Sequence, residues 1–312
     1  MNVAFDSRPA ADRRGIGRYV RSLLAALREL DQGELVETHR PRRVAVYHSP
    51  WIDGALLRCP VPMVVTLHDL VPLKRRGEYL RTGLRFRLRY LAVQRAMRVI
   101  VPTRVVADDA VELLGIAPER IAVVPEAASA TFRPRGAEEV ASVRSRYVLP
   151  EPYLLWVGGL EHPDPRKRIA ALTEASRRLP LVLVGAAKPW AWELPGVTLT
   201  GEVSDEELAA IYTGAHALVF PSDDEGFGLP PVEALACGTP VAASDVPAVR
   251  EVLGDRATLV EPADIDGLVA AAEASTRPAP APPLWSWEEA AAATWQVYSE
   301  AADSRGPMVP RG

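Results

Sequence analysis

Residues 217–245 read Ala-Leu-Val-Phe-Pro-Ser-Asp-Asp-Glu-Gly-Phe-Gly-Leu-Pro-Pro-Val-Glu-Ala-Leu-Ala-Cys-Gly-Thr-Pro-Val-Ala-Ala-Ser-Asp. The apolar run 217–220 ends at a proline, which predicts a short buried strand. The two prolines at 230–231 fit only the first turn of a helix, and the Gly-Thr-Pro at 238–240 ends that helix. A second buried strand begins at 241–243. Strand, loop, helix and strand in this order predict an α/β fold.

A glycine loop joins the first strand to the helix, and it reads Glu225-Gly226-Phe227-Gly228-Leu229. Two glycines let the backbone approach a ligand closely, and the helix N-terminus that follows favours an anion. Glu225 and Glu233 flank the loop with seven residues between them. Because a carboxylate accepts hydrogen bonds from vicinal hydroxyls, the stretch indicates a pocket for a phosphate flanked by two polyols. The alternative is an ordinary strand–helix turn with two surface glutamates.

The spacing from Glu225 to Glu233, with Gly-Phe-Gly-Leu-Pro inside it and Ala-Cys-Gly-Thr-Pro-Val after it, resembles a known signature. It is that of the retaining group 1 glycosyltransferases, the family of mannosyltransferases and sucrose synthase. The resemblance implies the GT-B fold, with two facing Rossmann-like βαβ domains and a cleft between them. We expect an acceptor-side domain at 1–135, a nucleotide-sugar-binding domain at 136–284 and a C-terminal helix at 285–312 that returns to the first domain.

Two connecting segments qualify this division. Residues 31–43 form only a short polar connector where the family usually has further βα units, so the first domain is expected to be trimmed. Residues 131–150, which are rich in Arg and Glu, are expected to form the linker between the domains.

The composition fits a chain of two globular domains, with 312 residues of which 48% are hydrophobic and 24% charged. The net charge of −4 divides unevenly: residues 1–135 hold 23 Lys or Arg and 14 Asp or Glu, which gives +9, and the remainder holds 13 and 26, which gives −13. The two domains are therefore expected to meet different partners. Two distant cysteines indicate neither a disulfide framework nor a zinc site. The residues before Asp6 are too few for a signal peptide and no apolar run can span a bilayer, so we expect a cytoplasmic protein.

The N-terminal strand, 2–5, is followed by Gly15-Ile16-Gly17-Arg18-Tyr19 and a helix that ends near Leu30. A strand, a glycine-rich loop and a helix form a phosphate-binding arrangement. Val20 stands where the dinucleotide fingerprint requires Gly or Ala, which argues against a nicotinamide cofactor. The resemblance implies that Gly15 and Gly17 face the donor diphosphate, and the alternative is a plain helix start.

A third strand, 61–67, ends at His68-Asp69. Residues at the carboxyl ends of parallel strands line the ligand site of such sheets. The run from Val64 to Leu73 resembles the strand of the family that ends in His-Asp, where the histidine lies at the reaction centre. His68 is therefore predicted to be catalytic, and His48, at the end of the preceding strand, is expected to be structural.

In the second domain, the strand 153–157 is followed by Gly158-Gly159 and then by Arg166-Lys167-Arg168. Charge that develops on a diphosphate leaving group needs fixed positive charge. The resemblance assigns this role to Lys167 with Arg166 beside it, whereas Gly159 stands near the place of an arginine that is usual in the family. Which of the three cations holds the phosphate stays open, and the alternative is a pair of surface charges at a helix start.

The most basic part of the chain, Lys74–Arg98, holds nine Lys or Arg and one acidic residue. One interpretation is a solvated amphipathic helix. The other is a surface that meets anionic lipid at the inner face of the membrane, or a phosphate-bearing acceptor. Its candidate residues are Arg81, Arg85, Arg87 and Arg89. No nucleic-acid-binding module accompanies the segment, so nucleic acid is not expected as a partner.

The resemblance implies transfer of a hexose, with retained configuration and without a metal, from a nucleotide diphosphate sugar to an acceptor hydroxyl. GDP-mannose is the first expectation for the donor, with UDP- and dTDP-sugars as alternatives, and a glycan, a lipid-linked sugar or a natural product as acceptor. The catalytic residues would be His68, Arg166, Lys167 and Glu225. The donor-binding residues would be Gly15, Gly17, Gly159, Val203, Gly226, Phe227, Gly228, Leu229 and Glu233, with Glu225 on the donor sugar and Glu233 on the ribose.

Other functions were weighed against this one. Asp223-Asp224-Glu225 looks like a metal-binding Asp-x-Asp motif, but the strand, loop and helix around it do not suit that type of enzyme, so neither metal nor cofactor is expected. A GT-B phosphorylase would need a pyridoxal-phosphate lysine motif, and an epimerase would release free sugar without an acceptor. The rival from another class is a non-catalytic nucleotide-sugar-binding or scaffold protein at a membrane surface.

Overall fold

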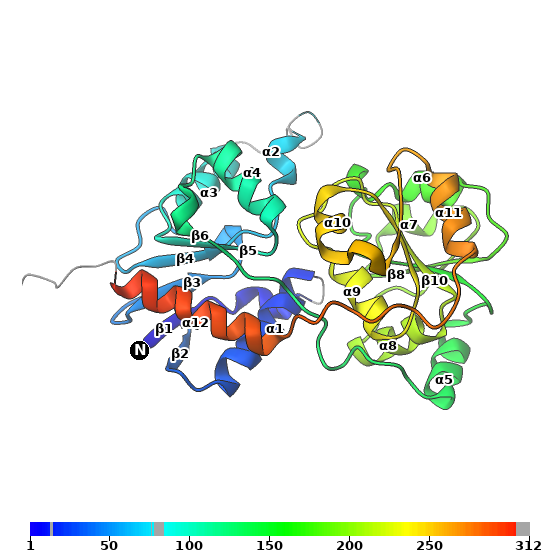
Figure 1. Ribbon diagram of the computed structural model, residues 1–312, viewed down its shortest axis with the longest axis horizontal. Coiled ribbons are helices and arrows are strands. Elements are labelled where there is room, and N and C mark those ends of the chain that lie inside the picture. The colour runs from blue at the N-terminus through cyan, green and yellow to red at the C-terminus, as the bar shows by residue number, and fades with distance from the viewer. Residues whose placement is uncertain (13–14, 76, 78–83, 304–312) are drawn as a thin grey trace, which may run out of the picture. The chain divides into compact units, whose positions relative to one another are not determined.

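The computed structural model describes residues 1–12, 15–75, 77 and 84–303, except the side chains of 84–86. It divides into two compact units (Figure 1). Unit 1 is formed by Met1–Glu126 together with the segment that begins at Trp285, and unit 2 is Ala127–Leu284.

Unit 1 is built on a six-stranded sheet of parallel strands in the order β2-β1-β3-β4-β5-β6. The strands are β1 (Asn2–Phe5), β2 (Glu34–Glu37), β3 (Val46–Ser49), β4 (Met63–Thr66), β5 (Arg98–Val101) and β6 (Ile121–Val123). The strands β3 and β4 are buried along their whole length, since a parallel sheet is covered on both faces. β4 is apolar up to Thr66, whereas β3 ends in the buried polar residues His48 and Ser49.

Helices cover both faces of this sheet. On one face α1 (Gly15–Glu29) and α12 (Trp287–Asp303) pack side by side (Figure 1) and bury Val3 and Phe5. On the other face, Ala4 lies in a second core with α3 (Leu84–Gln94) and α4 (Arg104–Leu114). Successive residues of β1 thus point to opposite cores, as the two-residue period of a strand requires. The remaining short helices are α2 (Val71–Lys74), η1 (Arg8–Ala11), η2 (Ile52–Gly54) and η3 (Pro118–Arg120).

Unit 2 has a second six-stranded parallel sheet, in the order β12-β11-β10-β7-β8-β9. Its strands are β7 (Leu154–Val157), β8 (Leu181–Val184), β9 (Val197–Leu199), β10 (Ala217–Phe220), β11 (Val241–Ser244) and β12 (Thr258–Val260). Its helices are α5 (Ala137–Tyr147), α6 (Ile169–Glu174), α7 (Pro189–Trp192), α8 (Asp205–Gly214), α9 (Leu229–Ala236), α10 (Pro247–Leu253) and α11 (Ile265–Glu273), with η4 (Pro165–Lys167) and η5 (Gly254–Arg256).

Local signals in the sequence set several of these boundaries. The helix α9 starts with two prolines in its first turn, as expected. The helix α8 starts with the predicted capping box: the Ser204 hydroxyl accepts from the Glu207 N–H at 3.2 Å, and the Glu207 carboxylate accepts from the Ser204 N–H at 2.9 Å.

Two expectations about connecting segments were wrong. The polar connector contains β2 (Glu34–Glu37), an edge strand that pairs only with β1 and is mostly exposed, so it lacks the apolar pattern of a buried strand. The expected linker contains α5 (Ala137–Tyr147), none of whose residues is buried, and this helix packs against α8 inside unit 2. In both cases a segment without an apolar face forms regular secondary structure, a strand in β2 and a helix in α5, because of its tertiary contacts.

Candidate active site

Unit 2 brings two predicted loops together where its strand order reverses. The chain runs from β7 to β8 and β9 on one side, and then returns to β10 on the other side of β7. In open α/β sheets, ligands bind outside the carboxyl ends of the strands at this reversal. The loop after β7 carries Arg166 and Lys167, and the loop after β10 carries Glu225.

In the loop after β7, Arg166 and Lys167 lie in the short 3-10 helix η4. Asp164 caps this turn, because its carboxylate accepts from the Arg166 N–H at 3.2 Å and from the Arg166 Nε at 2.9 Å. The Lys167 Nζ donates to the Gly159 carbonyl at 3.3 Å and lies 5.8 Å from the centre of the Trp156 ring. The glycine that stands in place of an arginine therefore contacts the neighbouring lysine through its backbone.

Two contacts join this loop to the loop after β10. The Arg166 Nη1 lies 3.6 Å from the Glu225 Oε2, and the Asp223 N–H donates to the Arg166 carbonyl at 2.9 Å. The Arg166 and Glu225 side chains are 18% and 15% exposed, so this pair is partly desolvated but still open to a ligand. Three of the four predicted catalytic residues thus lie at one edge of one sheet.

The charge of Lys167 is only partly stabilised by the protein. Burial lowers the pKa of its ammonium group and the positive charge of Arg166 lowers it further, whereas Glu225 acts in the opposite direction. Within the part of the chain that the structure describes, Lys167 forms no ion pair. An anion beside Lys167 would supply the missing stabilisation.

The glycine loop offers backbone donors rather than a full helix N-terminus. Gly228 has a φ of +92°, a left-handed conformation that side chains strain, so glycine is required there. Two of the first helical positions of α9 are prolines, which carry no N–H. Among the described residues no acceptor is present for the N–H groups of Gly228 and Leu229. These two groups are the free donors beside Glu225.

The other predicted donor-binding residues of unit 2 differ in access. The Glu233 side chain is completely buried in α9 and its carboxylate accepts from the Tyr212 hydroxyl at 3.1 Å, so ribose binding by Glu233 stays a prediction. Gly226 and Phe227, which follow each other in the same loop, are both buried. Val203 is half-buried and directly precedes the cap of α8.

In unit 1, His68 follows β4 and is held on three sides. Its Nδ1 lies 3.1 Å from the Glu126 Oε1, and its Nε2 lies 3.0 Å from the Pro50 carbonyl. The Tyr19 ring meets the imidazole edge-on, with 4.6 Å between ring centres. The His68 side chain is 17% exposed and that of Glu126 is 5% exposed. The imidazole is therefore fixed in orientation while part of it remains accessible.

Glu126 determines the protonation of His68. Burial by itself would lower the pKa of the imidazole, but the hydrogen bond and the negative charge of Glu126 outweigh it and raise the pKa above its ordinary value. An imidazolium at this position can donate from both nitrogens. Because Glu126 and the Pro50 carbonyl already accept from these nitrogens, the expected chemistry of His68 is electrostatic stabilisation of a polar ligand.

A buried chain of hydrogen bonds ends at the Tyr19 hydroxyl and holds the tyrosine ring in place. The His48 Nδ1 pairs with the Tyr298 hydroxyl at 2.6 Å, and the His48 Nε2 pairs with the Thr66 hydroxyl at 2.9 Å. Thr66 in turn pairs with the Tyr19 hydroxyl at 3.0 Å. Burial, with the charge of His68, lowers the pKa of His48 to about 3, so His48 stays neutral. This arrangement agrees with the structural role expected for His48 and connects α12 to the surroundings of His68.

The two glycines at the start of α1 differ. A Cβ at Gly17 would lie 1.8 Å from the Asp12 carbonyl oxygen and 2.7 Å from that of Pro9, so glycine is required there for close packing with η1. Gly15 is exposed, and no atom lies within 4 Å of the place of its Cβ. Gly15 therefore has open space toward a ligand, and diphosphate binding by both glycines stays a prediction.

The basic segment is described in part. Arg81 lies outside the described residues, and Arg85 is described by its backbone in α3 alone. Arg87 is exposed. Arg89 forms an ion pair with Asp53 at 2.8 Å, which neutralises one of the four candidate charges. Contact with an anionic membrane stays a prediction.

The described residues contain no helix long and apolar enough to cross a membrane. They also contain no cluster of three or more His, Cys, Asp or Glu side chains arranged to hold a metal ion.

Sequence reasoning missed the partners of the predicted residues. Glu126, Tyr19 and Tyr298 have no motif of their own, and they reach the surroundings of His68 from distant parts of the chain. The one available signal was the Pro-Glu-Ala after the last strand of unit 1, where the resembled family often has Pro-Asn-Gly. Asp164, which holds Arg166, has no motif of its own either.

Comparison with known proteins gives matches along most of the chain. The family model described as "Glycosyltransferase Family 4" matches residues 3–130, and the one described as "Glycosyl transferases group 1" matches residues 151–276. The chain is 30% identical over 288 residues to the O-antigen chain mannosyltransferase B of Escherichia coli, with 80% of this chain and 72% of that protein covered. It is 29% identical over 235 residues to the serotype-specific mannosyltransferase WbdA of Escherichia coli, of which it spans 28%, while 67% of this chain is covered.

Among solved structures, that of Anabaena Alr3699/HepE in complex with UDP-glucose resembles the chain with a TM-score of 0.67. The two sequences are 14% identical, and the match covers 97% of this chain and 95% of that chain. A likeness at this level of identity is one of fold. The expected pair of Rossmann-like units is confirmed.

Proposed function

The chain belongs to the group 1 glycosyltransferases and has the GT-B fold, and from this premise we propose that it transfers a sugar from a nucleotide diphosphate sugar to an acceptor hydroxyl with retained configuration. Mannose is the first candidate for the sugar. The proposal also covers the cytoplasmic location and the absence of a metal requirement that the sequence led us to expect.

The observation that carries this proposal is the junction of two loops in unit 2. The contact of 3.6 Å between Arg166 and Glu225 brings a cation and a carboxylate together at the carboxyl edge of the sheet. Lys167 lies in the first of these loops, and the N–H groups of Gly228 and Leu229, which have no acceptor among the described residues, lie at the end of the second. Cations and backbone donors suit a diphosphate, and a carboxylate suits sugar hydroxyls.

Each group has a proposed part in the reaction. Lys167 and Arg166 would stabilise the negative charge that builds on the departing nucleoside diphosphate as the bond to the sugar breaks. Because fixed cations supply this stabilisation, no metal ion is required for it. Glu225 would accept hydrogen bonds from the donor sugar, and the N–H groups of Gly228 and Leu229 would donate to the sugar or to a phosphate oxygen.

Unit 1 would contribute His68. Glu126 and the Pro50 carbonyl accept from the two ring nitrogens and Tyr19 fixes the ring, so His68 is preorganised to stabilise the sugar through the positive charge of its imidazolium. A covalent enzyme nucleophile is not part of the proposal. The acceptor hydroxyl would attack from the face that the leaving phosphate occupies, and a phosphate oxygen would take its proton.

The identity of the sugar donor is proposed from the names of similar proteins. Both relatives compared above carry the name mannosyltransferase, which favours GDP-mannose. The Anabaena protein of similar fold is known in complex with UDP-glucose, which keeps UDP-sugars as the second candidate. The acceptor is proposed only as a hydroxyl-bearing molecule.

Isothermal titration calorimetry with GDP-mannose, UDP-glucose and a dTDP-sugar, each with and without EDTA, tests the proposal. We expect one nucleotide class to bind with equal affinity in both conditions. Sugar transfer or slow hydrolysis of the bound donor would then establish an enzyme. Binding without any turnover would instead support the nucleotide-sugar-binding scaffold, and no binding of any donor would contradict the proposal.

A further inference from the structure

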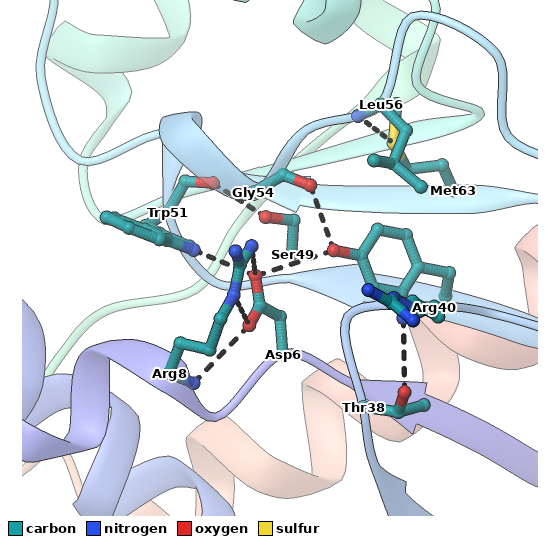
Figure 2. A network of polar contacts seen from close by, with 10 residues as sticks. Asp6, Arg8, Thr38, Arg40, Ser49, Trp51, Gly54, Leu56 and Met63 are labelled. Carbon is teal, nitrogen blue, oxygen red and sulfur yellow. Dashed lines mark hydrogen bonds and ion pairs between the residues drawn. The ribbon is translucent and has the colours of Figure 1, made fainter.

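A polar network lies at the reversal of strand order in unit 1, and none of the roles proposed above uses it. The chain runs from β1 to the edge strand β2 and then returns to β3 on the other side of β1. Asp6 directly follows β1, Arg8 starts η1, and Trp51 follows β3 (Figure 2). This place is equivalent to the one that holds Arg166 and Glu225 in unit 2.

The carboxylate of Asp6 is the centre of this network. Its Oδ1 accepts from the Arg8 Nε at 2.8 Å, and its Oδ2 accepts from the Arg8 Nη2 at 2.7 Å and from the Trp51 Nε1 at 3.0 Å. Asp6 is completely buried, whereas the Arg8 side chain is 49% exposed. Burial opposes the charge of Asp6, but the hydrogen bonds from Arg8 and Trp51 outweigh it and lower the pKa of the carboxyl.

The backbone around Asp6 is shaped to fit this network. A Cβ at Gly54 would lie 2.3 Å from the Asp6 Oδ2 and 2.6 Å from the Trp51 Nε1, so only glycine leaves room. The Tyr47 hydroxyl donates to the Gly54 carbonyl at 2.9 Å and holds this turn in place. A half-exposed ion pair usually contributes little to stability. The main effect of the pairing with Asp6 is that the planar guanidinium group of Arg8 is held in a fixed orientation.

On its solvent-exposed side the network offers guanidinium N–H donors of Arg8 and the aromatic ring of Trp51. Two of the three guanidinium nitrogens of Arg8 bind Asp6, and in the described part of the chain the third, Nη1, has no partner. The Arg8 Cζ lies 5.6 Å from the centre of the half-buried Trp51 ring. The indole N–H of Trp51 is already bound to Asp6. Trp51 therefore offers its ring alone, beside two N–H donors of Arg8.

Two described ion pairs reduce the net charge of this region. Arg8 is paired with Asp6, and the neighbouring Asp53 of η2 is paired with Arg89 of α3. A ligand that carries a full charge gains little from such a surface. An uncharged polyol gains more, because vicinal hydroxyls accept from a planar guanidinium and the apolar face of a pyranose ring packs on an indole.

We propose that Arg8 and Trp51 form a subsite for a neutral pyranose ring of the acceptor, positioned by Asp6. That the bound sugar belongs to the acceptor rests on the proposed function. The binding of a sugar to Arg8 and Trp51 can be measured whether or not the protein transfers sugars. The reacting hydroxyl of the acceptor is not assigned to this subsite. Its role is to bind and orient one sugar ring.

Saturation-transfer NMR with the methyl glycosides of mannose, glucose, galactose and N-acetylglucosamine tests the subsite. We expect saturation transfer to at least one of them with the wild-type protein. Arg8→Ala and Trp51→Leu should weaken that binding at least about tenfold, because each removes one of the two recognition groups. Arg40→Ala is the matched control, since Arg40 is exposed on the same unit and lies outside the contacts of Asp6, and it should bind like the wild type.

Arg8→Ala leaves Asp6 buried without its cation and can prevent folding. Arg8→Lys keeps the charge but loses the planar fork, so a folded Arg8→Lys protein should also lose at least about tenfold in affinity. Thermal denaturation of each variant identifies those that fold. Equal sugar binding in folded Arg8→Lys and Trp51→Leu proteins would overturn the proposal.

Two further results would also overturn it. The first is no saturation transfer to any of the four glycosides in the wild type, and the second is displacement of the glycoside by millimolar inorganic phosphate, which would identify an anion site. Calorimetry with GDP-mannose and UDP-glucose on the same variants separates the two proposals. Donor binding should be unchanged by Arg8→Lys, and its absence in the wild type would contradict the proposed function while the glycoside titration still tests the subsite.

Discussion

The two sheets reverse their strand order in the same way, between β1 and β3 in unit 1 and between β7 and β10 in unit 2, but different chemistry lies at the two places. In unit 2 the loops present Lys167, which has no ion pair with any described residue, and an Arg166–Glu225 pair that is partly exposed. In unit 1 they present an arginine held by the buried carboxylate of Asp6. One place suits an anionic ligand and the other a neutral one.

This difference runs against the net charge of the chain. Residues 1–135 carry 23 Lys or Arg against 14 Asp or Glu, yet at the reversal point of unit 1 Arg8 is paired with Asp6 and Arg89 with Asp53. The remainder carries 13 against 26, yet it holds the cations that suit a diphosphate. The strand order determines where a ligand binds, and the few side chains at that place, rather than the net charge of the domain, determine which ligand it is.

The largest expected effect tests the anionic character of the site in unit 2. Lys167→Ala should lower kcat/KM for sugar transfer about 10²–10³-fold and weaken binding of the free nucleoside diphosphate, because it removes fixed positive charge from the leaving group. Initial rates and calorimetry measure the two effects.

Arg168→Ala is the control for that variant, since Arg168 is the adjacent cation and caps the next helix with a left-handed backbone. Its nucleoside diphosphate affinity should be close to that of the wild type. A large loss in Arg168→Ala with little loss in Lys167→Ala would transfer the phosphate-binding role to Arg168.

The next prediction separates the sugar from the phosphate within unit 2. Glu225→Gln should lower the rate of transfer about 10²-fold, because the amide binds sugar hydroxyls more weakly than the carboxylate does. The affinity for the nucleoside diphosphate without a sugar should stay within about twofold, since an interaction with the sugar alone is removed. A parallel loss of both would place Glu225 on the phosphate side through its contact with Arg166.

A third prediction concerns the histidine of unit 1. Because the folded-state pKa of His68 is raised by Glu126, the pair stabilises the fold fully below the ordinary histidine value of 6.5, and this contribution is lost as the pH rises through the raised pKa. Glu126→Gln should remove the contribution and leave burial to lower the pKa of His68. An NMR titration of the imidazole measures the pKa of His68 in the wild type and in Glu126→Gln. An unchanged pKa in the variant would refute the role of Glu126.

The smallest effect is expected in the buried hydrogen-bond network of unit 1 that joins α12 to Tyr19. Tyr298→Phe removes the hydroxyl that pairs with His48 at 2.6 Å and should destabilise the protein by about 1–3 kcal/mol. Nucleotide binding in unit 2 should be unaffected. Thermal denaturation and calorimetry on one sample check both statements, and a weaker nucleotide affinity would mean that the two units are coupled through α12.

Much of unit 2 followed from the sequence because its signals are local. Glycines, prolines and short apolar runs fix the strand, loop and helix around Glu225 within a few residues, and the capping box at Ser204 spans four positions. Arg166 and Lys167 were found for the same reason, since they closely follow a strand. Their contact with Glu225 needed only the rule that the carboxyl ends of parallel strands share one edge.

Unit 1 followed less well because its contacts are distant in sequence. His68 was found from its strand, but Glu126 lies 58 residues away from it, and Trp51 lies 45 residues away from Asp6. No periodicity or motif connects such pairs. The strand β2 was missed because its exposed edge position gives it polar residues. The helix α5 was missed because none of its residues is buried.

Hydrogen–deuterium exchange of the wild-type protein with and without GDP-mannose, and in parallel with UDP-glucose, tests the contrast between the two reversal points most directly. The account predicts slower exchange on donor binding in the loops after β7 and β10, at residues 158–168 and 221–229, including the N–H groups of Gly228 and Leu229. Residues 6–8 and 51–54 should exchange as they do without donor. Protection by either nucleotide sugar that is confined to residues 6–8 and 51–54, with none at 221–229, would contradict the account.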